Sequence, residues 1–454
     1  MSFIKDLKKL LIKQPEKYPH NRNLMNDISP LIEYPYMSMM KSEISSTSAV
    51  RAHNLSLTLN LIRDRGSITR AEIINLTRLS APTVSSLVNI LISSGFVREG
   101  GIGMSSGGRK PVVLEFNYEA RMIMGVDMGA THITIIIMNL KGEVKKRFSC
   151  HMDVLSKPAE SLQVIHDAII KIMDEAGLVE SDLLGIGFTL PAPLEDEKTG
   201  SFVTHYMPAW KDVRCIGAIR DVYKDVPVYF ENDANAAAIA EQWWGCGLGY
   251  ENLVYIKLGT GVGSGLIING VVYRGFSGTA GEIGHTTIEA DGRSCRCGNR
   301  GCLESYIGIQ GILSDGRRAL ANDPNWAGRL DELDVKGVVK AAREGNRECE
   351  KIITTAGWYL GIGLANIINL VNPGLLILGG DLADAGQMLL DPARQSLMER
   401  TVGFNTRTDN LVIGELGSNA VAIGAATLVI TNAFNETSIY NSLRDMEQNA
   451  VING

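Results

Sequence analysis

The sequence predicts an α/β fold that carries a winged helix-turn-helix near its N-terminus, and three observations lead to this prediction. Residues 51–117 show three helical patterns and then two short strands around a Gly-rich loop, which is the element order of a winged helix-turn-helix. After about Tyr118, short apolar strands alternate with helices, as is typical of α/β domains. Two similar strand-rich segments begin at Asp127 and Gly259 and indicate a duplicated lobe that faces a cleft.

The three predicted helices have recognisable start and stop signals. The first covers residues 51–66. Thr69 and Glu72 form a capping box, in which the Thr hydroxyl and the Glu carboxylate each accept a backbone N–H, and this box starts a short helix over residues 70–76. Ser80 caps a third helix that ends at Gly95, and the strands are expected at 96–98 and 111–114.

The third predicted helix suits the major groove of DNA. A helix that enters this groove needs small or polar side chains near its N-terminus, because the backbone must approach the base edges; such residues are Ala81, Thr83, Ser85, Ser86 and Asn89. Phosphate contacts, which fix register without reading sequence, are expected from Arg70, Arg78 and Lys110. Arg109 in the wing is a candidate for the minor groove. A helical protein-interaction module with a polar surface is the alternative interpretation.

Length and composition limit the class of protein. A chain of 454 residues with 45% hydrophobic and 21% charged residues is expected to fold into about three globular units. Residues 1–120 hold 15 Lys and Arg against 10 Asp and Glu, whereas the whole chain has a net charge of −6, so a basic front end precedes an acidic body. No run of 18 apolar residues and no signal-peptide pattern is found, which predicts a cytoplasmic chain without a membrane partner.

Two glycine-rich loops follow predicted strands and are candidates for holding phosphate groups. The first contains Asp127, Gly129 and Thr131, where Gly129 permits a tight turn with its amides facing an anion and Asp127 could hold a magnesium ion through water. The second loop supplies Gly259, Thr260, Gly261 and Gly263. One such turn is as often a simple hairpin, but two of them beside strands favour a nucleotide or phosphate site.

A polar triplet between these loops is the candidate reaction centre. Asn232 and Asp233 follow a buried strand and precede an Ala-rich helix. Asp233 could remove a proton from a sugar hydroxyl, and Asn232 could bond neighbouring hydroxyls. The alternative interpretation is a helix N-cap, which Asn and Asp favour, and the two roles are compatible.

A cluster of Cys and His predicts a structural zinc site. His285 precedes Cys295, Cys297 and Cys302, and three thiolates with one imidazole suit the tetrahedral geometry of zinc. Free cysteines in a loop are the alternative. His285 has a second ring nitrogen for a ligand, and Glu282 and Glu304 flank the cluster with carboxylates that can accept hydrogen bonds from sugar hydroxyls.

These motifs resemble the ROK family of repressors, open reading frames and sugar kinases over about residues 51–430. The resemblance is carried by GEIGH at 281–285, CRCGNRGCLE at 295–304, ENDANAAA at 231–238, GTGVGSG at 259–265 and NPGLLILGG at 372–380. It implies a two-lobed actin/hexokinase-like (ribonuclease H-like) ATPase fold. It also implies nucleotide contacts that include Gly379 and Gly380, Asp233 as base in kinase members, and sugar contacts from Asn232, Asp233, Glu282, His285 and Glu304.

The chain departs from the family's kinase pattern at three places. Ala130 stands where active kinases have a second Gly in the first phosphate loop, and Ala192 stands where the family has Gly. Residues 207–210 look like a degenerate form of a loop near the sugar. These departures weaken ATP use more than sugar binding, although Asp233 is retained.

The expected units are a poorly ordered extension at 1–50, a winged helix-turn-helix at 51–117 and a sugar-kinase-like domain at 118–454. The lobes of that domain would be about 118–236 plus a C-terminal helix, and 237–420, with long helices at 159–177, 358–370 and 420–434. The expected function is a sugar-responsive repressor that binds operator DNA as a homodimer or homotetramer. An ATP- and magnesium-dependent sugar kinase and a zinc-stabilised scaffold without a ligand are the alternatives.

Overall fold

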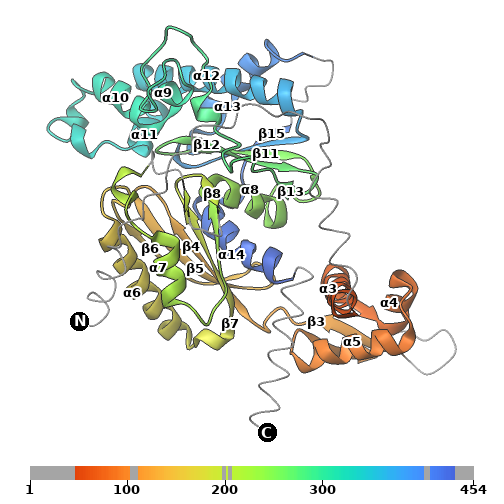
Figure 1. The fold of residues 1–454 in the computed structure, drawn as a ribbon. Helices are drawn as coiled ribbons and strands as arrows, with labels where there is room; N and C mark the ends of the chain where they lie inside the picture. The colour runs from red at the N-terminus through yellow and green to blue at the C-terminus, as the bar shows by residue number, and fades with distance from the viewer. Residues whose placement is uncertain (1–46, 103–110, 197–200, 203–206, 403–409, 435–454) are drawn as a thin grey trace, which may run out of the picture. The chain divides into compact units, whose positions relative to one another are not determined.

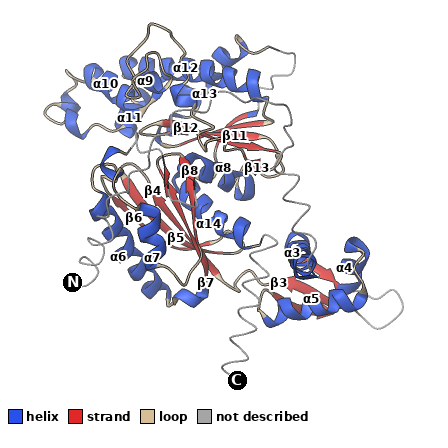
Figure 2. Ribbon diagram, in the orientation of Figure 1, coloured by secondary structure: helices blue, strands red, loops and turns tan. Residues whose placement is uncertain are grey.

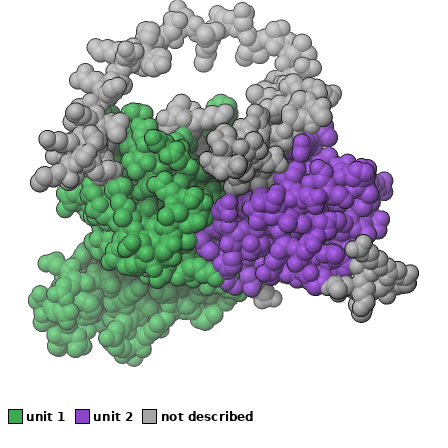
Figure 3. All heavy atoms as spheres, turned by 90° about the horizontal axis from the view of Figure 1, so that it is seen from below, with its two compact units in different colours: residues 1–11, 123–138, 144–429 green, residues 12–122, 139–143, 430–454 purple. Residues whose placement is uncertain are grey.

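The computed structural model describes residues 47–102, 111–196, 201–202, 207–402 and 410–434. The chain divides into two compact units, which are coloured separately in Figure 3. Among the described residues, the large unit comprises 123–138 and 144–429, and the small unit comprises 47–122, 139–143 and 430–434. Most of the predicted N-terminal extension, and Arg109 and Lys110 of the expected wing, lie outside the described residues.

The small unit contains three helices and a three-stranded antiparallel sheet (Figure 1). The helices are α3 (Thr47–Arg65), α4 (Arg70–Thr77) and α5 (Ala81–Ser93), and the sheet has the order β1 (Ser67–Thr69), β3 (Val112–Phe116), β2 (Val97–Ile102). The predicted capping box at the start of α4 is confirmed, because Oγ1 of Thr69 accepts from the N–H of Glu72 and Glu72 accepts from the N–H of Thr69 at 2.8 Å. The predicted cap at Ser80 is also confirmed.

The core of the small unit closes around Phe434, the residue that follows the last helix in the described part of the chain. Its side chain is only 4% exposed. Its ring packs edge-on against Phe96, with centroids 5.7 Å apart, and against Phe116 at 6.1 Å. The hydroxyl of Ser56 in α3 donates to the Phe434 carbonyl at 2.8 Å. The C-terminal end of the described chain is therefore part of the core formed by residues 49–118.

The large unit contains two five-stranded sheets with helices on their faces (Figure 2). The first sheet has the order β10 (Val228–Asn232), β7 (Leu183–Leu190), β4 (Met122–Met128), β5 (His132–Asn139), β6 (Val144–His151). The second has the order β13 (Val271–Val272), β12 (Val262–Ile268), β11 (Leu253–Leu258), β14 (Leu375–Gly379), β15 (Leu411–Ile413). A short pair, β8 (Leu194–Asp196) and β9 (Ser201–Phe202), stands apart. When the strands of each sheet are numbered 1 to 5 along the chain, both sheets have the spatial order 3-2-1-4-5, which for the first sheet is read from β6 to β10. The shared order confirms the predicted duplication.

The helices of the large unit follow the sheets in two sets. Those of the first lobe and the junction are α6 (Pro158–Ala176), α7 (Cys215–Val222), α8 (Asp233–Trp244) and α14 (Ala420–Ala433). Those of the second lobe are α9 (Glu304–Ile307), α10 (Ile309–Ala319), α11 (Val335–Arg343), α12 (Arg347–Val371) and α13 (Gln387–Met398). This arrangement is the actin/hexokinase-like α/β architecture.

Helix α14 approaches the backbones of its neighbours closely. A Cβ atom at Gly187 of β7 would lie 1.7 Å from the carbonyl oxygen of Ala425, and one at Gly424 would lie 1.8 Å from the carbonyl oxygen of Ala236 in α8. Glycine at these two positions therefore lets α14 pack against the first sheet and against α8. The close packing fixes the start of α14 beside the carboxyl ends of β4 and β10.

Helix α12 is long and apolar enough to cross a membrane, and it is the one described helix with this property. Half of its most apolar window is buried in the protein. Cβ atoms at Gly357 and Gly361 would each lie 2.4 Å from carbonyl oxygens of α13, so the two helices are closely packed. These contacts are those of a core helix.

We predict that Phe434→Ala destabilises the small unit by about 3–5 kcal/mol, the usual cost of deleting a buried aromatic ring. Hydrogen exchange of peptides from residues 51–117 in the full chain should accelerate accordingly. Phe276→Ala is the matched control, because Phe276 is fully exposed, at 108% of the reference area. Equal protection of the 51–117 peptides in both variants would show that Phe434 does not hold this core.

Candidate functional site

The large unit contains a cavity of about 190 Å³, which is room for roughly six water molecules. Its wall includes Asp127 at the end of β4, Asp233 at the start of α8 and Lys257 near the end of β11. The second glycine-rich loop and Val421 at the start of α14 complete the wall on two further sides. The cavity therefore lies where strand ends of both sheets converge, as expected for a ligand site in an α/β fold.

The polar triplet at the end of β10 combines the two predicted roles. Oδ1 of Asn232 accepts from the N–H of Ala234 at 2.9 Å and from that of Asn235 at 3.3 Å, so Asn232 is the N-cap of α8. Asn232 and Asp233 both line the cavity. The predicted N-cap is thus confirmed, and it does not remove Asn232 from the site.

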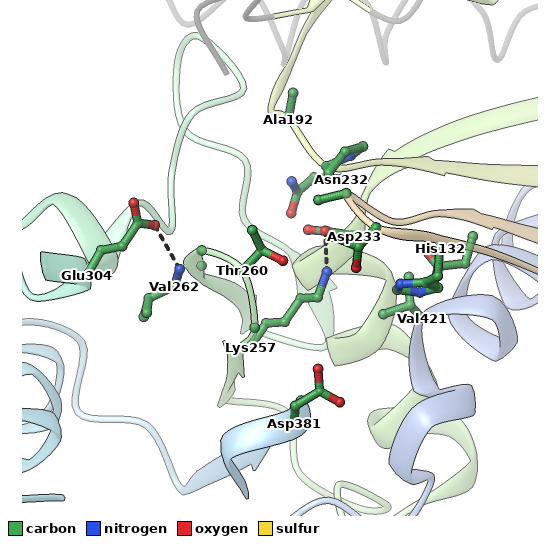
Figure 4. Close-up of a pocket in the computed structure, with 18 of the residues that line it drawn as sticks. His132, Ala192, Asn232, Asp233, Lys257, Thr260, Val262, Glu304, Asp381 and Val421 are labelled. Atoms are coloured by element: carbon green, nitrogen blue, oxygen red, sulfur yellow. Dashed lines mark hydrogen bonds and ion pairs between the residues drawn. The ribbon is translucent and has the colours of Figure 1, made fainter. Parts of the chain in front are cut away.

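Asp233 is not alone in the cavity wall. The ammonium group of Lys257 donates to its Oδ2 in a short ion pair (Figure 4). Lys257 lies on β11 of the second sheet, so this contact joins the two lobes across the cavity floor. Sequence reasoning missed Lys257, although a single charged residue within the apolar strand LVYIKL was a signal for it.

Asp127 also has partners within the protein. His132, the first residue of β5, bonds to its Oδ2 through Nε2 at 2.9 Å, and Thr189 of β7 donates to its Oδ1 at 3.1 Å. The imidazole covers the first glycine-rich turn, because a Cβ atom at Gly129 would lie 2.3 Å from the His132 ring. Sequence reasoning missed both partners, since nothing in the spacing of His132 shows that its ring folds back over Gly129.

These contacts shift the pKa values of His132, Asp127 and Lys257. The hydrogen bond to Asp127 raises the pKa of His132 above 6.5, against the opposing effects of burial and of Lys257. Burial raises the pKa of Asp127, but the bonds from His132 and Thr189 and the charge of Lys257 outweigh it and leave that pKa lowered. Burial lowers the pKa of Lys257, and the carboxylates of Asp233 and Asp127 more than reverse that effect. These contacts therefore favour the charged form of all three groups.

Most of the residues predicted to contact phosphate groups line the same cavity: Asp127, Thr131, Gly259, Thr260, Gly261, Gly263 and Gly380. Two others lie behind the wall. Gly129 lies under the His132 ring, and a Cβ atom at Gly379 would lie 1.8 Å from the hydroxyl of Tyr255. Ala130 and Ala192, the two departures from the kinase pattern, line the cavity itself.

The other predicted sugar contacts, Glu282, His285 and Glu304, lie at another side of the cavity from Asp233. Glu304 accepts from the N–H of Val262 at 2.9 Å and from Nε of Arg296 at 2.8 Å. In Figure 4, Glu304 reaches Val262 at one side and Lys257 reaches Asp233 at the other. Glu282 and His285 line the cavity as well. All five predicted sugar contacts therefore belong to one cavity, together with Arg296, which sequence reasoning missed.

The predicted metal ligands converge as well. Donor atoms of His285, Cys295, Cys297 and Cys302 all lie within 4.8 Å of one another. Nδ1 of His285 is 3.6 Å from Sγ of Cys295, and Sγ of Cys297 is 3.7 Å from Sγ of Cys302. A tetrahedral zinc ion with Zn–S of about 2.3 Å and Zn–N of about 2.1 Å needs S···N and S···S separations of about 3.6 and 3.8 Å. The four residues thus fit a metal ion of this size.

The two ring nitrogens of His285 face different partners. Nδ1 faces the cysteine cluster, whereas Nε2 lies 3.9 Å from a carboxylate oxygen of Glu282 at the cavity. One residue therefore belongs to both the metal cluster and the cavity wall, as the sequence predicts.

The residues predicted to contact DNA lie mostly on the exposed face of α5. Ala81, Ser85, Ser86 and Asn89 are exposed, and the opposite face of α5 is buried. Thr83 is half-buried and shares a hydrogen bond with Ser80 at 2.8 Å. Arg78 adopts the left-handed conformation that ends α4, with φ of 59°. The guanidinium of Arg70 pairs with Glu99 at 3.0 Å, an ion pair that the sequence did not suggest.

The fold and the cavity define a two-lobed, sugar-kinase-like α/β protein with a small helical unit attached. Residues 123–432 match the model of the ROK family, and the chain belongs to this family. It is 33% identical to the xylose repressor of Caldicellulosiruptor bescii over 384 residues, which are 84% of this chain and 96% of that repressor.

Two solved structures show different extents of similarity. A ROK family transcriptional regulator, described as a homologue of the Escherichia coli MLC protein, matches with a TM-score of 0.72 and 26% identity, covering 87% of this chain and 99% of that one. A ROK family glucokinase from Streptomyces griseus in complex with glucose and AMPPNP matches with a TM-score of 0.59 and 29% identity. That match covers 68% of this chain and 100% of the glucokinase.

We predict that the pKa of His132, measured by NMR titration of the full chain, lies above 6.5 and falls in Asp127→Asn. Because the folded-state pKa is raised, the pair stabilises the fold fully below pH 6.5, and this stabilisation is lost as the pH rises through the folded value. His166 in α6, whose pKa is lowered by burial, is the control that should not respond to Asp127→Asn. A His132 titration that Asp127→Asn leaves unchanged would contradict the pairing.

We also predict that the full chain binds one metal ion, with zinc preferred, and that Cys297→Ser loses it. Elemental analysis should find about one equivalent in the wild type and in Cys150→Ser, a control at a half-buried cysteine outside the cluster. Because metal binding is linked to folding of its loop, chelation should lower the melting temperature of the wild type more than that of Cys297→Ser. Equal metal content in both cysteine variants would contradict the assignment.

Proposed function

We propose that this protein is a sugar-responsive transcriptional repressor of carbohydrate genes, with the sugar bound in the cavity of the large unit. The observation that carries the proposal is the extent of the similarity. The xylose repressor and the transcriptional regulator align with 84% and 87% of the chain, whereas the glucokinase aligns with 68%. The chain therefore resembles regulators over a longer stretch than it resembles a kinase.

The proposed DNA-binding element is residues 51–117, as a winged helix-turn-helix. Helix α4, the left-handed turn at Arg78 and helix α5 follow one another as in that motif, and an antiparallel hairpin of β2 and β3 follows α5. The exposed face of α5 would present Ser85, Ser86 and Asn89 to base edges; Arg109 and Lys110, which the sequence predicts for the wing, lie outside the described residues. The sugar-kinase-like domain at 118–454 would carry the effector site.

The proposed effector site uses the carboxylates and amide that line the cavity. Asn232, Asp233, Glu282, His285 and Glu304 would hold the sugar hydroxyls. Zinc in the Cys–His cluster would be structural, because the protein supplies all four ligands and leaves no open position for a substrate. The repressor would act in the cytoplasm as a homodimer or homotetramer, so that two heads engage two half-sites.

A sugar kinase is the competing function, and retention of Asp233 together with the glucokinase match favours it. A coupled assay of ADP release over pentoses, hexoses and N-acetyl sugars separates the two functions. Turnover that is absent in Asp233→Ala would establish the kinase.

The test of repression is fluorescence anisotropy with DNA from upstream of the chain's own gene and with random DNA of equal length. We predict that the wild type binds the upstream DNA more tightly, and that one sugar of a panel that starts with xylose lowers this affinity at least tenfold. Ser86→Glu should weaken specific binding at least tenfold, because it places a negative charge at the proposed groove face.

Ser93→Glu is the matched control, since it places the same charge on an exposed residue at the other end of α5. Specific binding that survives Ser86→Glu would contradict the proposed recognition helix. Absence of any preference for upstream DNA would contradict repression itself.

A further inference from the structure

Charged side chains of both signs line the cavity. Three of the carboxylates that line the cavity, Asp127, Asp233 and Asp381, interact with Lys257. His132 lines the cavity as well and pairs with Asp127. Such carboxylates suit a hard divalent cation. Asp127 and Asp233, however, each already have a basic partner within the protein.

Lys257 is the more deeply placed of the two bases. Its ammonium contacts Oδ2 of Asp233 and interacts electrostatically with Asp127 and Asp381 as well. In Figure 4 the side chain rises from β11 toward Asp233, with Asp381 on its other side. A buried ammonium group is stable only when it is paired in this way. The ion pair is therefore a stable part of the cavity wall.

His132 is the second basic side chain and supplies a positive charge when it is protonated. Its ring bonds to Asp127 and covers the glycine turn in which the sequence predicts a phosphate. Lys257 and protonated His132 together carry two positive charges, which equal the charge of one divalent cation. Asp127 accepts from His132 and Thr189, one bond to each oxygen, so its carboxylate is engaged on both sides.

We propose that Lys257 takes the place of the divalent cation in this cleft and that the His132 ring occupies the turn where a phosphate would lie, so that the protein binds its sugar without magnesium and ATP and leaves it unphosphorylated. The magnesium·ATP group that the fold family implies does not fit the side chains of this cavity. Lys257 is then a positioning residue, which holds Asp233 as a fixed hydrogen-bond acceptor. The inference rests on the proposed effector site and explains how a kinase-like cleft serves a repressor.

The first experiment uses Mn²⁺ as the probe of cation binding in the cleft of the full-length, zinc-loaded chain. Electron paramagnetic resonance should detect no Mn²⁺ site at this cleft in the wild type. Lys257→Met, which keeps the approximate length of the side chain but removes its charge, should create a site that binds Mn²⁺ at least tenfold more tightly than the wild-type chain does. Lys336→Met, at an exposed lysine on α11, is the control for loss of one positive charge and should bind no more Mn²⁺ than the wild type.

The second experiment measures the NMR titration of His132, and it therefore does not require the sugar to be known. Because the charge of Lys257 opposes protonation of His132, its NMR titration should move to higher pH in Lys257→Met and stay near the wild-type position in Lys257→Arg. Mn²⁺ should broaden the His132 resonance in Lys257→Met and leave it sharp in the wild type.

The double variant Lys257→Met/Asp233→Asn guards against a failure to fold. Removal of both charges avoids an uncompensated buried carboxylate, so its melting temperature should recover part of the loss in Lys257→Met. A wild-type chain that binds Mn²⁺ or magnesium·AMPPNP in this cleft would overturn the proposal, and so would sugar binding that EDTA abolishes while zinc is retained.

These outcomes separate the inference from the proposed function. If the protein binds sugar without a divalent cation but shows no sugar-controlled DNA binding, the proposed repressor function is wrong and the role of Lys257 stands. If sugar controls DNA binding but requires magnesium and ATP, the repressor function stands and the role of Lys257 is wrong.

Discussion

The interaction on which the cavity depends is the ion pair between Asp233 and Lys257. Two sheets with the same strand order bring the carboxyl ends of their strands together, and this places Asp127 and Asp233 as buried residues in the cavity wall. Carboxylates in such a place repel one another and lose hydration. Lys257 from the second sheet and His132 from the first supply the compensating charge, so the two lobes meet through an electrostatic contact as well as through packing.

Local signals in the sequence predicted much of the fold. The capping box at Thr69 and Glu72 and the cap at Ser80 placed α4 and α5 within a residue or two, because caps depend only on neighbouring residues. Strand β1 was missed, since three residues give no periodicity and Ser67–Thr69 forms a strand only by pairing with β3. Helix α12 begins at Arg347, well before the expected residue 358, because Asn346 caps a polar first turn that the apolar pattern does not reveal.

The site was predicted unevenly for the same physical reason. The sequence identified residues in contiguous motifs that line the cavity or converge in space, such as the Cys–His cluster and the triplet at Asn232, because the members of each motif lie near one another in sequence. Lys257, Thr189 and Arg296 were not predicted, because each finds its carboxylate through the tertiary fold. The placement of Gly129 under the His132 ring also depends on a side-chain orientation that spacing does not determine.

The metal cluster and the cavity are linked by the covalent chain. Arg296 lies between two of the cysteine ligands, and Glu304 follows the third by two residues. Arg296 and Glu304 bond to each other at the cavity wall, and the N–H of Val262 in the second glycine-rich loop holds the same carboxylate. An ion that closes the loop on His285 would therefore fix the direction of Glu304 without touching a ligand. A metal ion held by these four donors would thus restrict the backbone that carries the hydrogen-bonding groups of the cavity wall.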